Sequence, residues 1–341
     1  MKTMKKVLAV LVSMVMVLAF CVTGVAANVE LTQHTFAAYQ IFKGDLTEGN
    51  KLSNVTWGDG VQGEKLLTEL KKQAAFVTCA SAADVAKVLE TYNTDNTKAN
   101  AFAKTVAAHV TDMKTTGTGK VNLPAAGYYL IVDTTDTTGK DDAKNLSFLK
   151  VNGAGTVTPT EKTDKPTLKK KVKYVNDSTG AGTDWQDSAD YDIGDDVPFK
   201  LEGTVASNYA DYKHYYFAFH DVEEQGLAFN NDAKVYVNGV KITSGYTVKT
   251  KTDGITDGCT FEVEFEDLKD IDGVGAGSKI TVEYTSKLTD KANLGNQGNV
   301  NKAKLVFSNN PNSDQAGKPD KPGETPWDNV IVFTYKVVVN K

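Results

Sequence analysis

Short segments that alternate apolar and polar residues fill the second half of the chain and constrain its fold most. The alternation recurs after Thr167 in VPFKLEG, HYYFAFHD, TFEVEFEDL and KITVEYTSKL. A two-residue period places every second side chain on one face of a β-strand. Asn238-Gly239 separates two further short runs and is a dipeptide that type I′ hairpin turns favour. Strands at this spacing predict a β-sandwich of immunoglobulin-like architecture.

The first half of the chain has a mixed pattern. Strand-like HTFAAYQIF comes early and GYYLIVDTT late, whereas EKLLTELKKQ and SAADVAKVLETY between them have helical periodicity. Ser81 and Asp84 form the capping-box pattern that starts a helix. We therefore predict a mainly β protein of tandem immunoglobulin-like sandwiches, the N-terminal one with inserted helices.

Length and composition predict two domains. About 310 residues remain after removal of a signal peptide. This length exceeds that of most domains with a single hydrophobic core. Apolar periodicity stops in the polar stretch VTPTEKTDKP, where proline disfavours helix in the residue before it. The predicted parts are an N-terminal domain at 28–156, a linker at 157–166 and a β-sandwich domain at 167–341.

Residues 1–27 have the pattern of a secretory signal peptide. Three lysines precede an almost wholly apolar run, and the small residues Val25-Ala26-Ala27 follow as a cleavage site. The protein is therefore predicted to be exported. Loss of the three lysines changes the formal net charge from -5 to -8, which argues against a nucleic-acid partner.

Motifs for catalysis or metal binding are absent from the sequence. It contains neither a G-x-S-x-G nor an H-E-x-x-H pattern, and the four histidines show no metal-ligand spacing. We expect no turnover of an external substrate, no metal and no cofactor. His214 and His220 lie at the ends of an aromatic strand and are expected to be surface or interface residues. Cys79 and Cys259 are too far apart to suggest a disulfide framework.

One lysine conflicts with the pattern of its own strand. In TLKKKVKYV, Lys170 shares a face with Leu168, Val172 and Tyr174. Lysine is almost never fully buried unless it is paired. Alternatively, its flexible stem returns the amine to water. The residues alone leave both interpretations open.

The chain resembles a known family along its whole mature length. The segments AAYQIFKGDLTEGNKLSNVTWGDGV, LPAAGYYLIVD and DKPTLKKKV, followed by YDIGDDVPFKLEGTV, HDVEEQGLAFN and GNVNKAKLVFSNNP, resemble Gram-positive isopeptide-forming pilin subunits, the sortase-assembled fimbrial backbone proteins. The resemblance implies a structural subunit of a surface pilus. The alternative is a wall-anchored adhesin that binds host protein or glycan. It also implies a location at the cell surface or cell wall of a Gram-positive bacterium.

The resemblance implies a covalent bond within the second domain. Family domains link a lysine of the first strand to an asparagine near the domain end, with an acidic residue beside both. The matching residues are Lys170, Asn309 and, as proton shuttle, Asp221. Asp221 and Asn309 have the inward parity of neighbouring apolar residues. Asn301 has it too and is the alternative to Asn309.

The resemblance also implies partners, namely sortase and other pilin subunits. A linker lysine would attack the thioacyl intermediate that sortase forms. We assign this role to Lys162, with Lys165 as the alternative, although the family tyrosine of a Y-P-K motif is missing here. A solvated linker lysine without this role is the remaining interpretation. The family also has a further domain and a sorting motif after the strand at 330–341, so we expect the chain to be a fragment.

Overall fold

The computed structural model describes residues 12–13, 34–47, 51–92, 95–159, 163–176, 179–255 and 257–335. The chain divides into two compact units. The first comprises Met1–Asp136 and Asn145–Lys162, and the second Thr137–Lys144 and Thr163–Lys341. The main division thus falls within the stretch predicted as a linker, whereas Thr137–Lys144 groups with the second unit. Except for residues 12–13, the predicted signal peptide lies outside the described residues.

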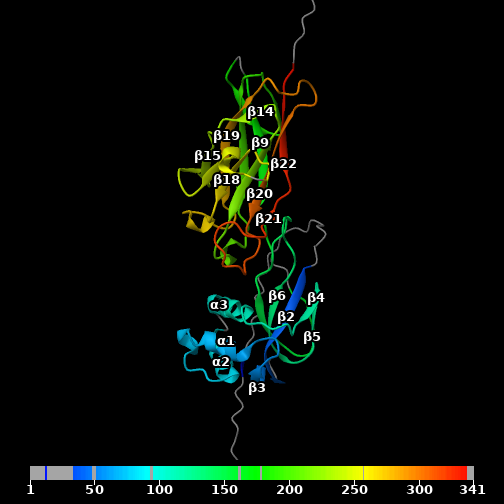
Figure 1. Cartoon of the computed structure of the whole chain (residues 1–341), viewed down its shortest axis with the longest axis vertical. Coiled ribbons are helices and arrows are strands. Elements are labelled where there is room, and N and C mark those ends of the chain that lie inside the picture. Colours follow the sequence, from blue (N-terminus) through cyan, green and yellow to red (C-terminus); the bar gives the residue numbers. More distant parts are fainter. Residues whose placement is uncertain are drawn as a thin grey trace, which may run out of the picture. The chain divides into compact units, whose positions relative to one another are not determined.

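An antiparallel sheet forms the centre of the first unit (Figure 1). Its strands, in sheet order, are β1 (Val12–Ser13), β3 (Lys51–Trp57), β2 (Thr35–Thr47), β6 (Gly127–Asp133) and β7 (Phe148–Asn152), with β4 (Thr115–Thr118) paired to β2. A separate antiparallel pair consists of β5 (Val121–Leu123) and β8 (Gly155–Val157). Side chains of β5 and β8 pack with Phe36 of β2 and Ile131 of β6 in one apolar cluster.

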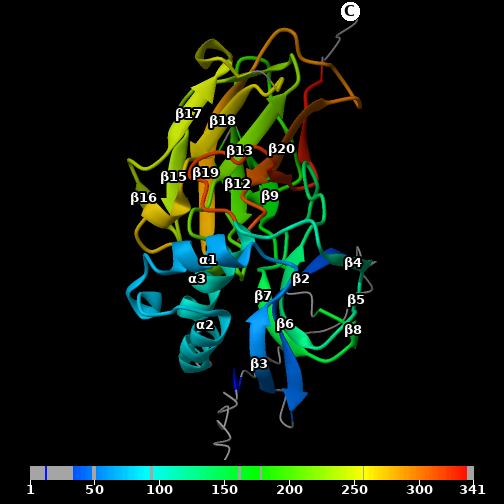
Figure 2. The ribbon, with the colours of Figure 1, turned by 60° about the horizontal axis from the view of Figure 1, so that its bottom comes forward.

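Three helices lie together beside this sheet (Figure 2). They are α1 (Gly63–Leu70), α2 (Ala82–Leu89) and α3 (Asn96–Ala107). The predicted start of α2 is confirmed, because the Ser81 hydroxyl accepts a hydrogen bond from the Asp84 backbone N–H at 3.2 Å. Leu66 and Leu70 of α1 pack in a second apolar cluster with Leu130 of β6. No helix in the described part of the chain is long and apolar enough to cross a membrane.

Two seven-stranded sheets form the second unit. The first sheet has the order β10 (Gly182–Gln186), β9 (Thr167–Val175), β12 (Asp196–Thr204), β19 (Lys279–Leu288), β15 (Lys234–Val237) and β16 (Val240–Ile242), with β14 (Leu227–Phe229) paired to β19. The second has the order β11 (Ser188–Asp190), β22 (Asp328–Phe333), β20 (Asn299–Phe307), β13 (Phe217–Glu223), β18 (Phe261–Phe265) and β17 (Thr247–Thr250), with β21 (Gly323–Glu324) paired to β20. Strands of both sheets run along this unit in Figure 1.

Alternating side chains from both sheets fill one core in the second unit. Phe199 of β12, Phe219 of β13 and Leu305 of β20 are all fully buried there. The arrangement confirms the predicted mainly β fold with a sandwich in the second half. The predicted hairpin is also confirmed, because Asn238 and Gly239 join β15 to β16 with φ of 49° and 83°. Positive φ at both positions is what a type I′ turn requires.

Candidate functional site

Lys170 lies in the middle of β9 with its side chain in the core of the second unit. It is 0% exposed and pairs in register with Leu201 of β12. Its Nζ atom donates hydrogen bonds to Asp221 Oδ2 at 2.5 Å and to Tyr284 Oη at 2.7 Å. The amine also lies 5.5 Å from the ring centroid of Phe199. The alternative in which the stem returns the amine to water is therefore wrong.

The Tyr284 hydroxyl is the centre of a buried polar cluster. It accepts hydrogen bonds from Lys170 Nζ and from Asn301 Nδ2, the latter at 3.0 Å, and donates to Asp221 Oδ2 at 2.8 Å. These bonds use the one proton and both lone pairs of a phenol. Asp221 and Asn301 are both 0% exposed. An amine, a carboxyl group and a carboxamide thus meet at one oxygen atom inside an apolar core.

Strand pairing explains why these residues meet. Asp221 of β13 lies opposite Ala303 of β20, and Glu223 lies opposite Asn301. Asn301 is therefore one inward position away from the partner of Asp221. Tyr284 reaches the cluster from β19 of the other sheet, where it packs with a ring-centroid distance of 5.4 Å to Phe199. The cluster therefore joins the inner faces of both sheets.

Burial shifts the protonation equilibria of this cluster. Loss of solvation lowers the pKa of Lys170 from its ordinary value, against the opposing attraction of Asp221. It raises the pKa of Asp221, again against the influence of the lysine. Burial and the neighbouring Asp221 raise the pKa of Glu223 to about 7. The shifts at Lys170 and Asp221 both favour a neutral amine beside a protonated carboxyl group.

Two oxygen atoms of the cluster lack hydrogen-bond partners among the described residues. They are Asp221 Oδ1 and Asn301 Oδ1. A buried acceptor without a partner is costly. A proton on the carboxyl group of Asp221 would supply a donor for the carboxamide oxygen, so the neutral form of the pair suits both atoms.

The structure does not bring Asn309 to Lys170. Asn309 follows the end of β20, is 2% exposed, and donates hydrogen bonds to the backbone oxygen and to Oγ1 of Thr137 at 3.0 and 2.9 Å. It lies about six residues, or roughly 20 Å, along the chain from Ala303, which faces Asp221. Our first choice of asparagine therefore needs correction. Parity correctly predicted that Asn309 faces inward, but it could not show how far along the strand Asn309 lies. Asn301 is the asparagine that shares the Tyr284 hydroxyl with Lys170.

Only one of the two candidate linker lysines lies among the described residues. Lys162 lies outside the described residues. Lys165 is described, and its amine donates a hydrogen bond to the Asp141 backbone oxygen at 2.7 Å and pairs with the Asp141 carboxylate. Its side chain is 41% exposed. Both assignments remain predictions.

The sequence patterns did not predict the role of Tyr284, and they gave Glu223 only as the next candidate acid after Asp221. Tyr284 has the same parity in KITVEYTSKL as Ile280 and Val282, so its inward direction was available from the pattern. Its hydroxyl gave no signal, since a tyrosine on a core face normally contributes its ring. Glu223 accepts a hydrogen bond from the Ser286 hydroxyl and has one oxygen without a partner among the described residues.

Comparison with solved structures finds pilins. The T6 backbone pilin of serotype M6 Streptococcus pyogenes matches with a TM-score of 0.49 and 20% identity, over 90% of this chain and 62% of that one. The major pilin SpaD of Corynebacterium diphtheriae matches with a TM-score of 0.45 and 17% identity, over 86% and 60%. The major pilin BcpA of Bacillus cereus matches with a TM-score of 0.38 and 16% identity, over 66% and 57%.

The chain is similar to Gram-positive backbone pilins. This is the class of protein that its sequence resembles. The chain spans about three fifths of the length of these solved structures. No protein-family model matches the chain, and no curated protein matches it.

Proposed function

We propose that the chain is a structural subunit of a sortase-assembled surface pilus, stabilised by an autocatalytic isopeptide bond between Lys170 and Asn301. One observation carries the cross-link, namely that the amine, the carboxyl group and the carboxamide all contact the Tyr284 hydroxyl in a fully buried cluster. The resemblance of the sequence to sortase-assembled pilins supports the pilus role, and the predicted signal peptide supports export.

The reaction is an exchange of one amide for another. The neutral Nζ atom of Lys170 attacks Cγ of Asn301, a new C–N bond forms, and the bond from Cγ to Nδ2 breaks. One proton passes from the lysine nitrogen to the leaving nitrogen, so that ammonia departs. No oxidant, reductant or cofactor enters the balance. Because the fold already holds the reacting groups together, proximity replaces the binding of a substrate.

Asp221 is suited to move the proton and to stabilise the developing negative charge. Its Oδ2 atom lies 2.5 Å from Lys170 Nζ, within reach of the proton that the amine must lose. In its protonated form the carboxyl group donates to the Asn301 oxygen as charge grows there in the tetrahedral intermediate. The same group then delivers a proton to the leaving nitrogen. Tyr284 positions the two nitrogens and touches Asp221, so we assign it a positioning role.

The proposed bond would connect the two sheets of the second unit. Lys170 is on β9, the first strand after the linker, and Asn301 is on β20 of the other sheet. It would close a loop of about 130 residues, for which the chain-entropy model gives a stabilisation of about 5 kcal/mol. A protein under tension along its length gains resistance to separation of the sheets, without the redox sensitivity of a disulfide.

A matched pair of asparagine variants tests the cross-link. The mature protein should be lighter by one ammonia than its sequence mass, and the deficit should survive boiling in detergent and reductant. Asn301→Ala should remove the deficit, whereas Asn309→Ala should keep it. Full sequence mass in the folded wild-type protein would refute the bond. Loss of the deficit only in Asn309→Ala would return the assignment to that residue.

Polymerisation is tested separately at the linker. The chain is joined to a sortase sorting signal and incubated with sortase and other subunits. Lys162→Ala should abolish the high-mass ladder and leave the internal mass deficit intact, whereas Lys170→Ala should remove the deficit and still permit polymer. A ladder lost only in Lys165→Ala would move the acceptor by three residues. A ladder that persists in both linker variants would exclude the linker as the acceptor.

A further inference from the structure

His220 is buried on the outer face of the second sheet of the sandwich. Its neighbour Asp221 points into the core, so the alternation of β13 turns His220 away from it. The prediction that His220 lies at the surface is nevertheless wrong, because its exposed fraction is 1%. The turn before β18 contacts this side chain through Asp257 and Cys259, which shield it from water.

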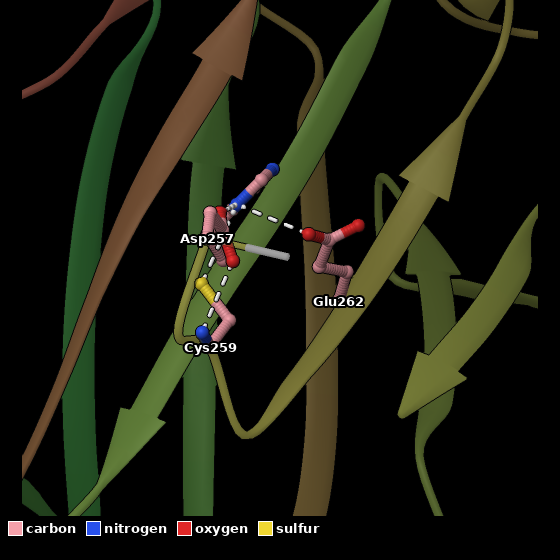
Figure 3. Close-up of side chains that lie close together, drawn as sticks. Asp257, Cys259 and Glu262 are labelled. Atoms are coloured by element: carbon pink, nitrogen blue, oxygen red, sulfur yellow. Dashed lines mark hydrogen bonds and ion pairs between the residues drawn. The ribbon is translucent and has the colours of Figure 1, made fainter. Parts of the chain in front are cut away.

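Four side chains with different donor atoms meet around this imidazole. Figure 3 shows Asp257, Cys259 and Glu262 converging on one point. The carboxylate of Asp257 lies 2.5 Å from His220 Nδ1, Cys259 Sγ lies 3.5 Å from it, and Glu262 Oε1 lies 3.4 Å from it. One donor atom from each of the four residues can be chosen so that all lie within 4.8 Å of one another.

The backbone holds these side chains in place. His220 and Glu262 are directly opposite in the antiparallel pair of β13 and β18. Asp257 Oδ1 accepts a hydrogen bond from the Cys259 backbone N–H at 3.0 Å, across Gly258 with its positive φ of 85°. The backbone N–H of Thr260 then donates to the Asp221 backbone oxygen at 2.7 Å. The turn is therefore fixed to β13 on both sides of the cysteine.

One imidazole proton cannot serve both carboxylates. A proton on Nδ1 of His220 would serve Asp257, and the Glu262 carboxylate lies 3.4 Å from the same nitrogen, beyond good hydrogen-bond length. Glu262 is 8% exposed, and Oε1 of its carboxylate forms a long ion pair with His220 Nδ1 at 3.4 Å. Two carboxylates therefore share one imidazole nitrogen, and buried charges need close partners. A cation at the convergence point would serve the imidazole, the thiolate and both carboxylates together.

Two of the separations between donor atoms match those around a tetrahedral zinc ion. Bonds of about 2.0–2.3 Å place nitrogen and oxygen ligands about 3.4 Å apart, and nitrogen and sulfur ligands about 3.6 Å apart. The contacts of His220 Nδ1 with Glu262 and Cys259, at 3.4 and 3.5 Å, match these separations. Asp257 would have to withdraw from the imidazole by about 1 Å. Its side chain is 35% exposed and belongs to a turn, so this movement meets little packing.

We propose that His220, Asp257, Cys259 and Glu262 bind one zinc ion. The cation forms bonds to Nδ1, Sγ and the carboxylate oxygens, and the thiol proton leaves to solvent on binding. A thiolate and an imidazole together favour zinc over magnesium or calcium. Two lysines lie opposite members of the site. Lys304 lies opposite His220 on β20, and its amine contacts Glu324 at 2.5 Å. Lys249 lies opposite Glu262 on β17, and its amine pairs with Glu264. Sequence patterns did not predict this site, because its residues come together only through the pairing of β13 with β18.

Metal binding is tested on the mature protein after chelation. Calorimetry with Zn²⁺ should show one equivalent bound, and the unfolding temperature should rise with zinc concentration. Co²⁺ should give the visible bands of a tetrahedral site and a thiolate charge-transfer band in the near ultraviolet. Cys259→Ser should remove the charge-transfer band and weaken Zn²⁺ binding at least tenfold. The matched control Cys79→Ser, a buried cysteine of the first unit, should change neither.

A second variant covers the case in which Cys259→Ser does not fold. Glu262→Gln keeps the shape of the side chain, removes its charge and should weaken Zn²⁺ binding about tenfold. Three outcomes would overturn the proposal, namely no zinc-dependent change in unfolding temperature, a charge-transfer band that persists in Cys259→Ser, or equal Zn²⁺ binding in all variants. None depends on the ammonia mass deficit, so the cross-link and the metal site are tested independently.

Discussion

Replacing Tyr284 by phenylalanine should slow formation of the proposed isopeptide bond without preventing it. The change keeps the ring against Phe199 and removes only the hydroxyl that holds Lys170 Nζ and Asn301 Nδ2. The reacting amine and carboxamide are neutral, and a hydrogen bond between neutral groups is worth about 0.5–1.5 kcal/mol. If that interaction positions the reacting groups in the transition state, its loss slows the reaction by about 2- to 12-fold.

Pulsed synthesis measures this rate. Freshly made protein is quenched in denaturant at successive times, and the fraction that has lost ammonia is read from intact mass. Tyr216→Phe is the matched control, because it also removes a buried hydroxyl, one that donates to Glu264 at 2.9 Å. Tyr216 has no contact with the lysine among the described residues. Bond formation at the wild-type rate in Tyr284→Phe, or equal slowing in both variants, would refute the positioning role.

Two further predictions concern the acidic residues of the cluster. Asp221→Ala should fold without losing ammonia, and its unfolding temperature should fall; a normal rate of cross-linking would instead assign the proton shuttle to Glu223. Glu223 has a pKa raised to about 7 in the folded protein, so it binds more protons folded than unfolded between about pH 4.5 and 7. The stability it contributes is present below that range and lost as pH rises through it. Glu223→Gln should therefore flatten this part of the dependence of unfolding free energy on pH, whereas an unchanged slope would contradict the raised pKa.

The sequence predicted which face each site residue occupies, but not which residues meet. Period-two alternation put Lys170, Asp221, Asn301 and Asn309 on inward faces, and all four are buried in the structure. Alternation carries no information on register, since a shift of two residues leaves parity unchanged. Only the pairing of Asp221 with Ala303 distinguishes the two asparagines. Pairing is set by contacts along the whole of β13 and β20 and cannot be read from either segment alone.

The histidine cluster shows a second limit of sequence patterns. Metal motifs are recognised when ligands are close in sequence, as on one helix or in one loop. Here Asp257 and Cys259 are close, but His220 comes from a different strand and meets Glu262 only through strand pairing. The expectation of a surface histidine failed for the same reason. The end of a strand is exposed only if no loop folds over it. Here the turn at 257–260 folds over the end of β13 and covers His220.

The energetics of the Lys170 cluster give a reason for a covalent bond at this place. An amine and a carboxyl group without exposure lose their solvation, and such a pair is often no more stable than apolar residues of similar volume. Before reaction the cluster therefore adds little to the stability of the sandwich. Conversion of the amine and the carboxamide into one amide removes the ionisable nitrogen. Asp221 can then remain neutral and donate to the new amide oxygen. Formation of the bond therefore removes the desolvation cost of the Lys170 amine. The stabilisation that the cross-link gives by closing a loop of the chain remains as a net gain.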